Sequence, residues 1–204
     1  NRFGPANEIG VFEMREEGLV GVANPSALFL SDHDDGVPGA AVFAAVEGSR
    51  PLLVEIQALV TPAPPGSPRR ATVGLDSSRL AMVLAVLEGR CGLVMGGRDV
   101  YLNVAGGLRV QEPAADLAVA LAILSSLAGC PTPRNTVTVG EIGLAGEVRS
   151  VGHLDMRLRE ANRLGFARAV LPAGRAVPET PLAVTPVRRV ADLLDLLPGA
   201  WSDR

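Results

Sequence analysis

The stretch Pro113–Leu127 constrains the fold most, because almost every residue in it is apolar. It reads P-A-A-D-L-A-V-A-L-A-I-L-S-S-L. Pro113 suits the first position of a helix, and Gly129 suits the position just after its end. A helix that is apolar on all sides is buried on all sides. Other elements of the chain must therefore enclose this one.

Hydrophobic patterns before and after this helix predict the elements that cover it. Helices with apolar residues at helical spacing are predicted over Asp76–Arg90, with Ser77 or Ser78 as its cap, and over Gly152–Leu164 and Val190–Leu197. Strands are predicted over Ala40–Val46, Leu52–Val60, Arg98–Val104, Asn135–Gly140, Glu147–Val151, Ala167–Leu171 and Leu182–Val184. This order of elements predicts a mixed α/β (α+β) domain.

A polar stretch near the N-terminus predicts a boundary between two units. Ser31–Gly39 reads S-D-H-D-D-G-V-P-G, which is typical of a connection. The segment before it includes a predicted strand at Glu8–Met14 and is too short to bury a core of its own. We therefore expect a first unit over 1–35 and a complete domain over 36–204. The chain begins at Asn1 without a methionine, so we expect it to be part of a longer protein.

Charge and cysteine content narrow the classes of function. All 19 basic residues are arginine, and the formal net charge is −3, which argues against a grip on nucleic acid by the whole surface. Arginines that gather on one face still bind phosphate well, because the guanidinium group pairs with it in a bidentate manner. Cys91 and Cys130 are too few for a disulfide framework and lack metal-site spacing. We expect reduced thiols in a cytoplasmic protein, no metal site, no signal peptide and no membrane span.

Three motifs resemble the core of the Lon protease domain family. They are E-P-A-A-D at Glu112–Asp116, G-E-I-G-L-A-G-E-V at Gly140–Val148, and G-H-L-D at Gly152–Asp155. In that family Pro-Ser-Ala-Gly supplies a nucleophilic serine, and Gly-Gly-Leu-Lys supplies the lysine that activates it. The serine position falls here on Ala114 and the lysine position on Asp155. The resemblance, which covers roughly Val42–Leu197, therefore implies a Lon-like fold without protease activity.

The composition excludes the Ser-Lys mechanism independently of this resemblance. The chain has no lysine, and arginine stays protonated in proteins, so it cannot act as the base. A peptidase with another nucleophile remains as a minor alternative, with Ser125 or Ser126 as the hydroxyl. For Asp116 we expect a structural role at the positive end of the helix. Glu141 and Glu147 are expected to face solvent or a neighbouring subunit. On the helix predicted over Gly152–Leu164, the solvent face is expected to carry Asp155, Arg157, Arg159, Glu160 and Arg163.

The first residues resemble a second family. Asn1, Arg2, Phe3 and Gly4 match the end of the Lys-Asn-Arg-Phe-Gly signature of the bacterial RadA (Sms) DNA-repair proteins. This resemblance implies that 1–35 is the C-terminal remnant of a RecA-like ATPase domain and that 36–204 is the Lon-like domain. It also implies a hexameric ring around DNA and a recombinase of the RecA type as a partner. ATP and Mg²⁺ would belong to the missing motor, which would be a DNA-dependent ATPase, and zinc to a missing finger. We expect no cofactor in this chain.

Arginines at loop ends are the candidates for contact with DNA. They would bind phosphate without sequence preference, on single-stranded DNA and on branched or double-stranded DNA as further candidates. The candidates are Arg69, Arg70, Arg90, Arg98 and Arg109. Two alternatives stay open. The first is that each arginine is a solvated surface charge or forms an ion pair between subunits. The second is that the domain is an oligomerisation or protein-docking module without DNA contact.

Overall fold

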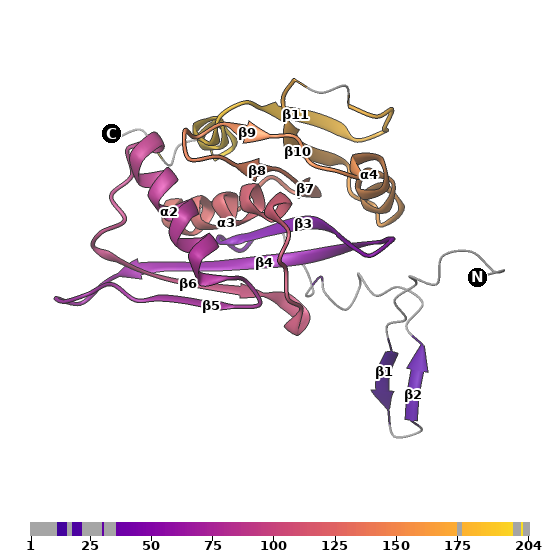
Figure 1. Cartoon of the computed structure of the whole chain (residues 1–204), viewed down its shortest axis with the longest axis horizontal. Helices are drawn as coiled ribbons and strands as arrows, with labels where there is room; N and C mark the ends of the chain where they lie inside the picture. Colours follow the sequence, from indigo (N-terminus) through magenta and orange to yellow (C-terminus); the bar gives the residue numbers. More distant parts are fainter. Residues whose placement is uncertain are drawn as a thin grey trace.

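The computed structural model describes residues 12–15, 18–21, 30, 36–174, 177–197 and 201. The predicted signature residues Asn1, Arg2, Phe3 and Gly4 lie outside these ranges. Strands β1 (Phe12–Arg15) and β2 (Gly18–Gly21) form an antiparallel hairpin. Figure 1 shows this hairpin apart from the main sheet.

Seven strands form the main sheet, in the order β11-β10-β7-β3-β4-β6-β5. Neighbouring strands are parallel except for β3–β4 and β4–β6, which are antiparallel. The strands are β3 (Ala40–Glu47), β4 (Arg50–Pro62), β5 (Arg70–Val73), β6 (Arg98–Val104), β7 (Thr136–Thr138), β10 (Arg168–Pro172) and β11 (Ala183–Val187). A small separate pair consists of β8 (Glu141–Ile142) and β9 (Val148–Arg149). The predicted mixed α/β class is confirmed.

Helices connect and cover these strands. They are α2 (Ser77–Cys91), α3 (Asp116–Ala128) and α4 (Leu154–Arg163), with short 3₁₀ turns η1 (Ala105–Gly107), η2 (Pro113–Ala115) and η3 (Val190–Leu196). Both α3 and α4 contact β3 and β4. In Figure 1, α3 lies beside α2, close to the long strands β3 and β4.

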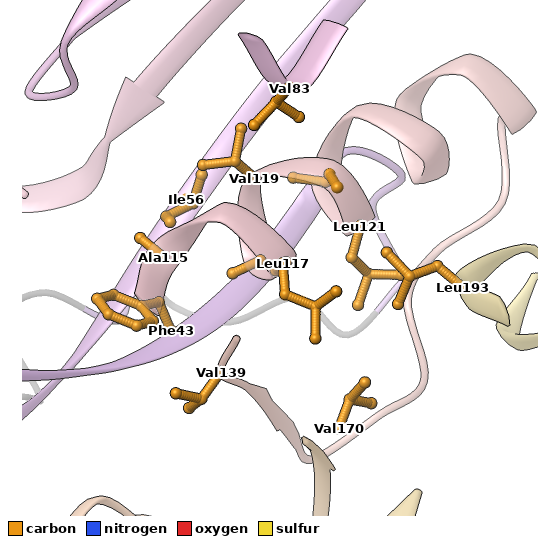
Figure 2. Close-up of a cluster of buried hydrophobic side chains, with 14 of the residues drawn as sticks. Phe43, Ile56, Val83, Ala115, Leu117, Val119, Leu121, Val139, Val170 and Leu193 are labelled. Carbon is orange, nitrogen blue, oxygen red and sulfur yellow. The ribbon is translucent and has the colours of Figure 1, made fainter. Parts of the chain in front are cut away.

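The central helix is enclosed as its sequence predicts. Every residue of α3 from Asp116 to Ser125 is buried. Gly129 ends the helix in the left-handed conformation, and its N–H donates to the carbonyls of Ser125 and Ser126. Figure 2 shows side chains of α3 among those of α2, the sheet and η3. The labelled side chains are Phe43, Ile56, Val83, Ala115, Leu117, Val119, Leu121, Val139, Val170 and Leu193.

Some local predictions differ from the structure. The predicted strand at Glu147–Val151 is limited to Val148–Arg149. Asp76, not Ser77 or Ser78, caps α2, because its carboxylate accepts the N–H groups of Ser78 and Arg79 at 2.9 and 3.2 Å. The closing helix is the 3₁₀ turn η3. The predicted strand at Asn135–Gly140 ends at Thr138, since Gly140 instead exchanges hydrogen bonds with the start of the central helix, at Ala114 and Leu117.

Candidate nucleic-acid interface

The direction of the strands brings several arginines to one end of the main sheet. Strands β7 and β10 begin side by side there, with Arg168 opposite Thr136. The last residue of β4, Pro62, pairs with Arg98, the first residue of β6. Strand β5 begins at Arg70, opposite Val100 of β6. We call this the arginine end. It consists of Arg69, Arg70, Arg98, Arg134 and Arg168.

The arginine end has two groups of residues at different positions along the strands. The starts of β7 and β10 lie near the start of β3, whose Ala40 pairs with Gln57 of β4. Strand β4 runs on from Gln57 to Pro62 before it meets Arg98. The group on β5 and β6 therefore lies farther out along the sheet than the group on β7 and β10.

The outer group contains three of the five predicted arginines. The guanidinium group of Arg70 donates from Nη2 to the carbonyl of Met95 at 2.8 Å and from Nη1 to the carbonyls of Arg69 and Arg98. Backbone carbonyls thus hold this cation in place without neutralising it. Asp99 is buried and accepts the backbone N–H of Arg69 at 2.7 Å. Within the described ranges, the side chains of Arg69 and Arg98 have no ion-pair partner.

The inner group was missed by the sequence analysis. Arg134 and Arg168 are exposed, and neither forms an ion pair with any residue that the structure describes. The backbone ties them together, because the N–H of Arg168 donates to the carbonyl of Asn135 at 3.0 Å. Each arginine stands at or just before a strand that the sequence does predict. Only the parallel pairing of β7 with β10, which periodicity does not reveal, makes them neighbours.

Arg90 and Arg109 lie elsewhere. Arg90 is in the last turn of α2, and its Nε donates to the carbonyl of Leu144 in the β8–β9 turn at 3.3 Å. Arg109 follows β6 and therefore lies toward the opposite end of the sheet, where it lines pockets of about 550 and 310 Å³. The structure thus brings Arg69, Arg70 and Arg98 together and leaves the other two apart. Contact of any of them with DNA stays a prediction.

The two positions of the lost dyad are filled by ordinary structural contacts. Ala114 is buried in η2, and its carbonyl accepts the N–H of Gly140 at 2.8 Å. Asp155 forms an exposed ion pair with Arg159 at 3.1 Å on α4. Neither residue has a hydroxyl or an amine to offer.

A buried ion pair joins the two segments that carry these positions. Arg157 of α4 donates from Nη2 to Glu112 Oε2 at 2.5 Å and from Nη1 to Oε1 at 3.1 Å. Its side chain is 3% exposed, although the sequence pattern places Arg157 on the solvent face of the helix. That prediction is wrong because the pattern counts every arginine as exposed. A carboxylate partner and backbone carbonyls make its burial tolerable.

A second buried pair fixes the start of α3. Arg79 donates to Asp116 from Nε at 2.9 Å and from Nη2 at 2.5 Å, and the N–H of Ile142 donates to the same carboxylate at 3.2 Å. Burial raises the pKa of the Asp116 carboxyl above its usual range, and this outweighs the lowering by the Arg79 hydrogen bonds. These contacts suit the structural role that the sequence predicts for Asp116, but its partners are Arg79 of α2 and the backbone of Ile142, and not the N–H groups at the start of its own helix.

The remaining hydroxyl and carboxylate candidates are also engaged in structure. Ser125 Oγ accepts the N–H of Gly39 at 2.8 Å and donates to the carbonyl of Cys130 at 2.6 Å. Ser126 Oγ accepts the N–H of Val60 at 2.9 Å. Glu141 and Glu147 both pair with Arg149, at 3.3 and 2.5 Å. A serine whose hydroxyl is committed to backbone groups is a poor nucleophile.

No helix in the part of the chain that the structure describes is long and apolar enough to cross a membrane. No group of three or more His, Cys, Asp or Glu side chains in those ranges is placed to hold a metal ion.

Comparison with known proteins identifies relatives over nearly the whole chain. A family model described as subunit ChlI of Mg-chelatase matches residues 68–175. A DNA repair protein RadA of Brucella abortus is 60% identical over 174 residues, which are 85% of this chain and 37% of the relative. Proteins of the same name from Halalkalibacterium halodurans and Pseudomonas aeruginosa are 48% and 50% identical over 98% and 97% of this chain.

The chain spans less than half the length of these curated relatives, 44% in the latter two. The family model matches more than half of the chain, since 108 of its 204 residues lie between 68 and 175. The chain therefore belongs to the family described as subunit ChlI of Mg-chelatase. Its similarity to the RadA proteins confirms the resemblance to RadA that its sequence predicts.

Proposed function

We propose that this chain is a DNA-contacting, non-proteolytic domain of a DNA-repair protein of the RadA type. The observation that carries the proposal is the arginine end of the main sheet. Arg69, Arg98, Arg134 and Arg168 gather there without ion-pair partners among the described residues, although the net charge of the chain is −3. Unpaired guanidinium groups at one end of a sheet suit the regularly spaced phosphates of DNA.

The non-proteolytic part of the proposal rests on the dyad positions. Ala114 and Asp155 supply neither nucleophile nor base. A Lon-like course of the backbone is supported at His153, which has a φ of 57°. Few residues other than glycine adopt this conformation, and the Gly-Gly-Leu-Lys motif has glycine at that position. The proposal assigns 36–204 to the Lon-like domain and 1–35 to the end of a RecA-like motor.

The assembly and partners follow from the same proposal. The domain would form a hexameric ring with its copies and hold single-stranded, branched or double-stranded DNA along the arginine end. ATP, Mg²⁺ and zinc would bind to other parts of the full-length protein, which would act with a recombinase of the RecA type in the cytoplasm. The relatives, which are named DNA repair protein RadA, support the repair role.

A second candidate is an oligomerisation or docking module with no DNA contact. Two observations favour it. The chain is acidic overall, and Leu59 of β4 and Val73 of β5 are 56% and 59% exposed on the two strands that flank β6. They line one shallow pocket together with Tyr101. Exposed apolar patches of this kind often mark protein contacts.

Fluorescence anisotropy with labelled DNA distinguishes the two candidates. The parent is compared with Arg69→Ala/Arg98→Ala and Arg134→Ala/Arg168→Ala, and light scattering measures the mass of each preparation. The DNA-contact proposal predicts binding that both double variants weaken at unchanged mass. An assembled parent that binds no DNA at low salt would leave the docking module.

A further inference from the structure

One edge of β3 is satisfied by side chains where a neighbouring strand would be expected. Strand β7 pairs with β3 only at Val42 and Phe43, whereas β3 continues to Glu47. Beyond this point the carbonyl of Ala44 accepts a hydrogen bond from Arg157 Nη1 at 2.5 Å. The N–H of Val46 donates to Glu112 Oε1 at 3.0 Å.

These two bonds reproduce the pattern of a parallel strand. In a parallel pair, one residue of the neighbouring strand donates its N–H to the carbonyl of residue i and accepts the N–H of residue i+2. Ala44 and Val46 stand in this relation. Arg157 supplies the donor, Glu112 supplies the acceptor, and their ion pair holds the two groups together at 2.5 Å.

A pocket adjoins the edge that the ion pair occupies. It has a volume of about 550 Å³, and Val46 and Glu112 both contribute to its wall. The apolar part of the wall consists of Ala45, Leu52, Val54, Leu108 and Val110. An unpaired strand edge beside an apolar pocket is the usual arrangement for binding an extended peptide, because the edge supplies main-chain bonds and the pocket takes side chains.

We propose that Glu112 and Arg157 act as a built-in substitute for a strand, which closes the edge of β3 to extended polypeptides. The inference deepens the proposed non-proteolytic function and rests on it. Loss of proteolysis then has two causes, the missing dyad at Ala114 and Asp155 and a closed peptide edge. Without the pair, the carbonyl of Ala44 and the N–H of Val46 would be free to bind an added strand.

The test opens the edge without leaving a lone buried charge. In Glu112→Ala/Arg157→Met both charged groups are removed, and methionine keeps much of the apolar volume of the arginine. Glu112→Gln is the matched control, because its side-chain oxygen still accepts the N–H of Val46. Binding of fluorescein-labelled β-casein, an unfolded polypeptide, is followed by anisotropy. The double variant is expected to bind at least about tenfold more tightly than the parent and the control.

Two outcomes would overturn the proposal. One is a double variant with the circular dichroism of the parent that binds casein no better than the parent does. The other is a parent that already binds as tightly as the double variant. DNA anisotropy on the same preparations separates this result from the proposed function, since the arginine end does not include Glu112 or Arg157.

Hydrogen exchange gives a second test if the double variant fails to fold. The amide of Val46 in the parent should exchange slowly, although no strand pairs with it on that side in the described chain. Glu112→Ala should increase its exchange rate while amides in the middle of β4 stay protected. A parent in which Val46 exchanges as fast as the exposed turn residue Gly48 would refute the inference.

Discussion

Removing the Glu112 side chain and removing the Arg157 side chain should lower the stability of the domain by different amounts. Glu112→Ala leaves a guanidinium group that is 3% exposed without its carboxylate, whereas Arg157→Ala leaves a carboxylate that is 27% exposed. Removing one partner of a buried pair costs about 3–5 kcal/mol. Because water reaches Glu112 more easily, we expect about 3 kcal/mol for Arg157→Ala and a value nearer the upper limit for Glu112→Ala.

The double variant Glu112→Ala/Arg157→Met tests the reasoning further. It removes both charges, so most of the loss should be recovered and its stability should lie within about 2 kcal/mol of the parent. Urea unfolding followed by circular dichroism measures all three variants. Arg159→Ala is the matched control on the same helix, because its exposed pair with Asp155 should contribute less than about 1 kcal/mol. Single variants that each cost under about 1 kcal/mol, or a double variant no more stable than they are, would refute the argument.

Three further predictions concern the centre of the domain. Leu121→Ala in α3, where the side chain is 1% exposed, should lower the free energy of unfolding by about 2–5 kcal/mol; an unchanged urea midpoint would contradict the buried helix. Gly74→Ala should lower the melting temperature, because φ is +79° and a Cβ would lie 2.3 Å from the carbonyl oxygen of Leu108. Burial raises the pKa of Asp116 in the folded state, so its ionisation lowers the stability of the fold as the pH rises from about 4. Over this pH range, the melting temperature of the parent should therefore fall relative to that of Asp116→Asn. Melting temperatures of the two proteins that change in parallel with pH would contradict the raised pKa.

The helices and most strands were predictable because their side-chain periodicity is strong. The central helix is apolar on all sides, so its burial follows from its sequence. The strand β6 has the predicted bounds, Arg98–Val104. The closing turn η3 was less predictable, since α and 3₁₀ helices of seven residues share almost the same apolar spacing.

The candidate site was only partly predictable, because it depends on strand order and on buried charges. Arg69, Arg70 and Arg98 were found from their loop-end positions in the sequence. Arg134 and Arg168 meet through the parallel pairing of β7 with β10, which are about 30 residues apart in the chain. Arg157 was misplaced, since its partner Glu112 is distant in sequence and a helical pattern cannot show that an arginine is paired.

The salt dependence of DNA binding tests the central claim most directly. Each phosphate contact contributes a slope of about −0.9 to a plot of log binding constant against log salt for duplex DNA. Removal of two contacts in Arg69→Ala/Arg98→Ala should therefore make the slope shallower by about 1.8. Arg109→Ala, toward the opposite end of the sheet, should leave it unchanged. A parent without measurable binding at low salt, or equal slopes for the parent and the double variant, would contradict DNA contact at the arginine end.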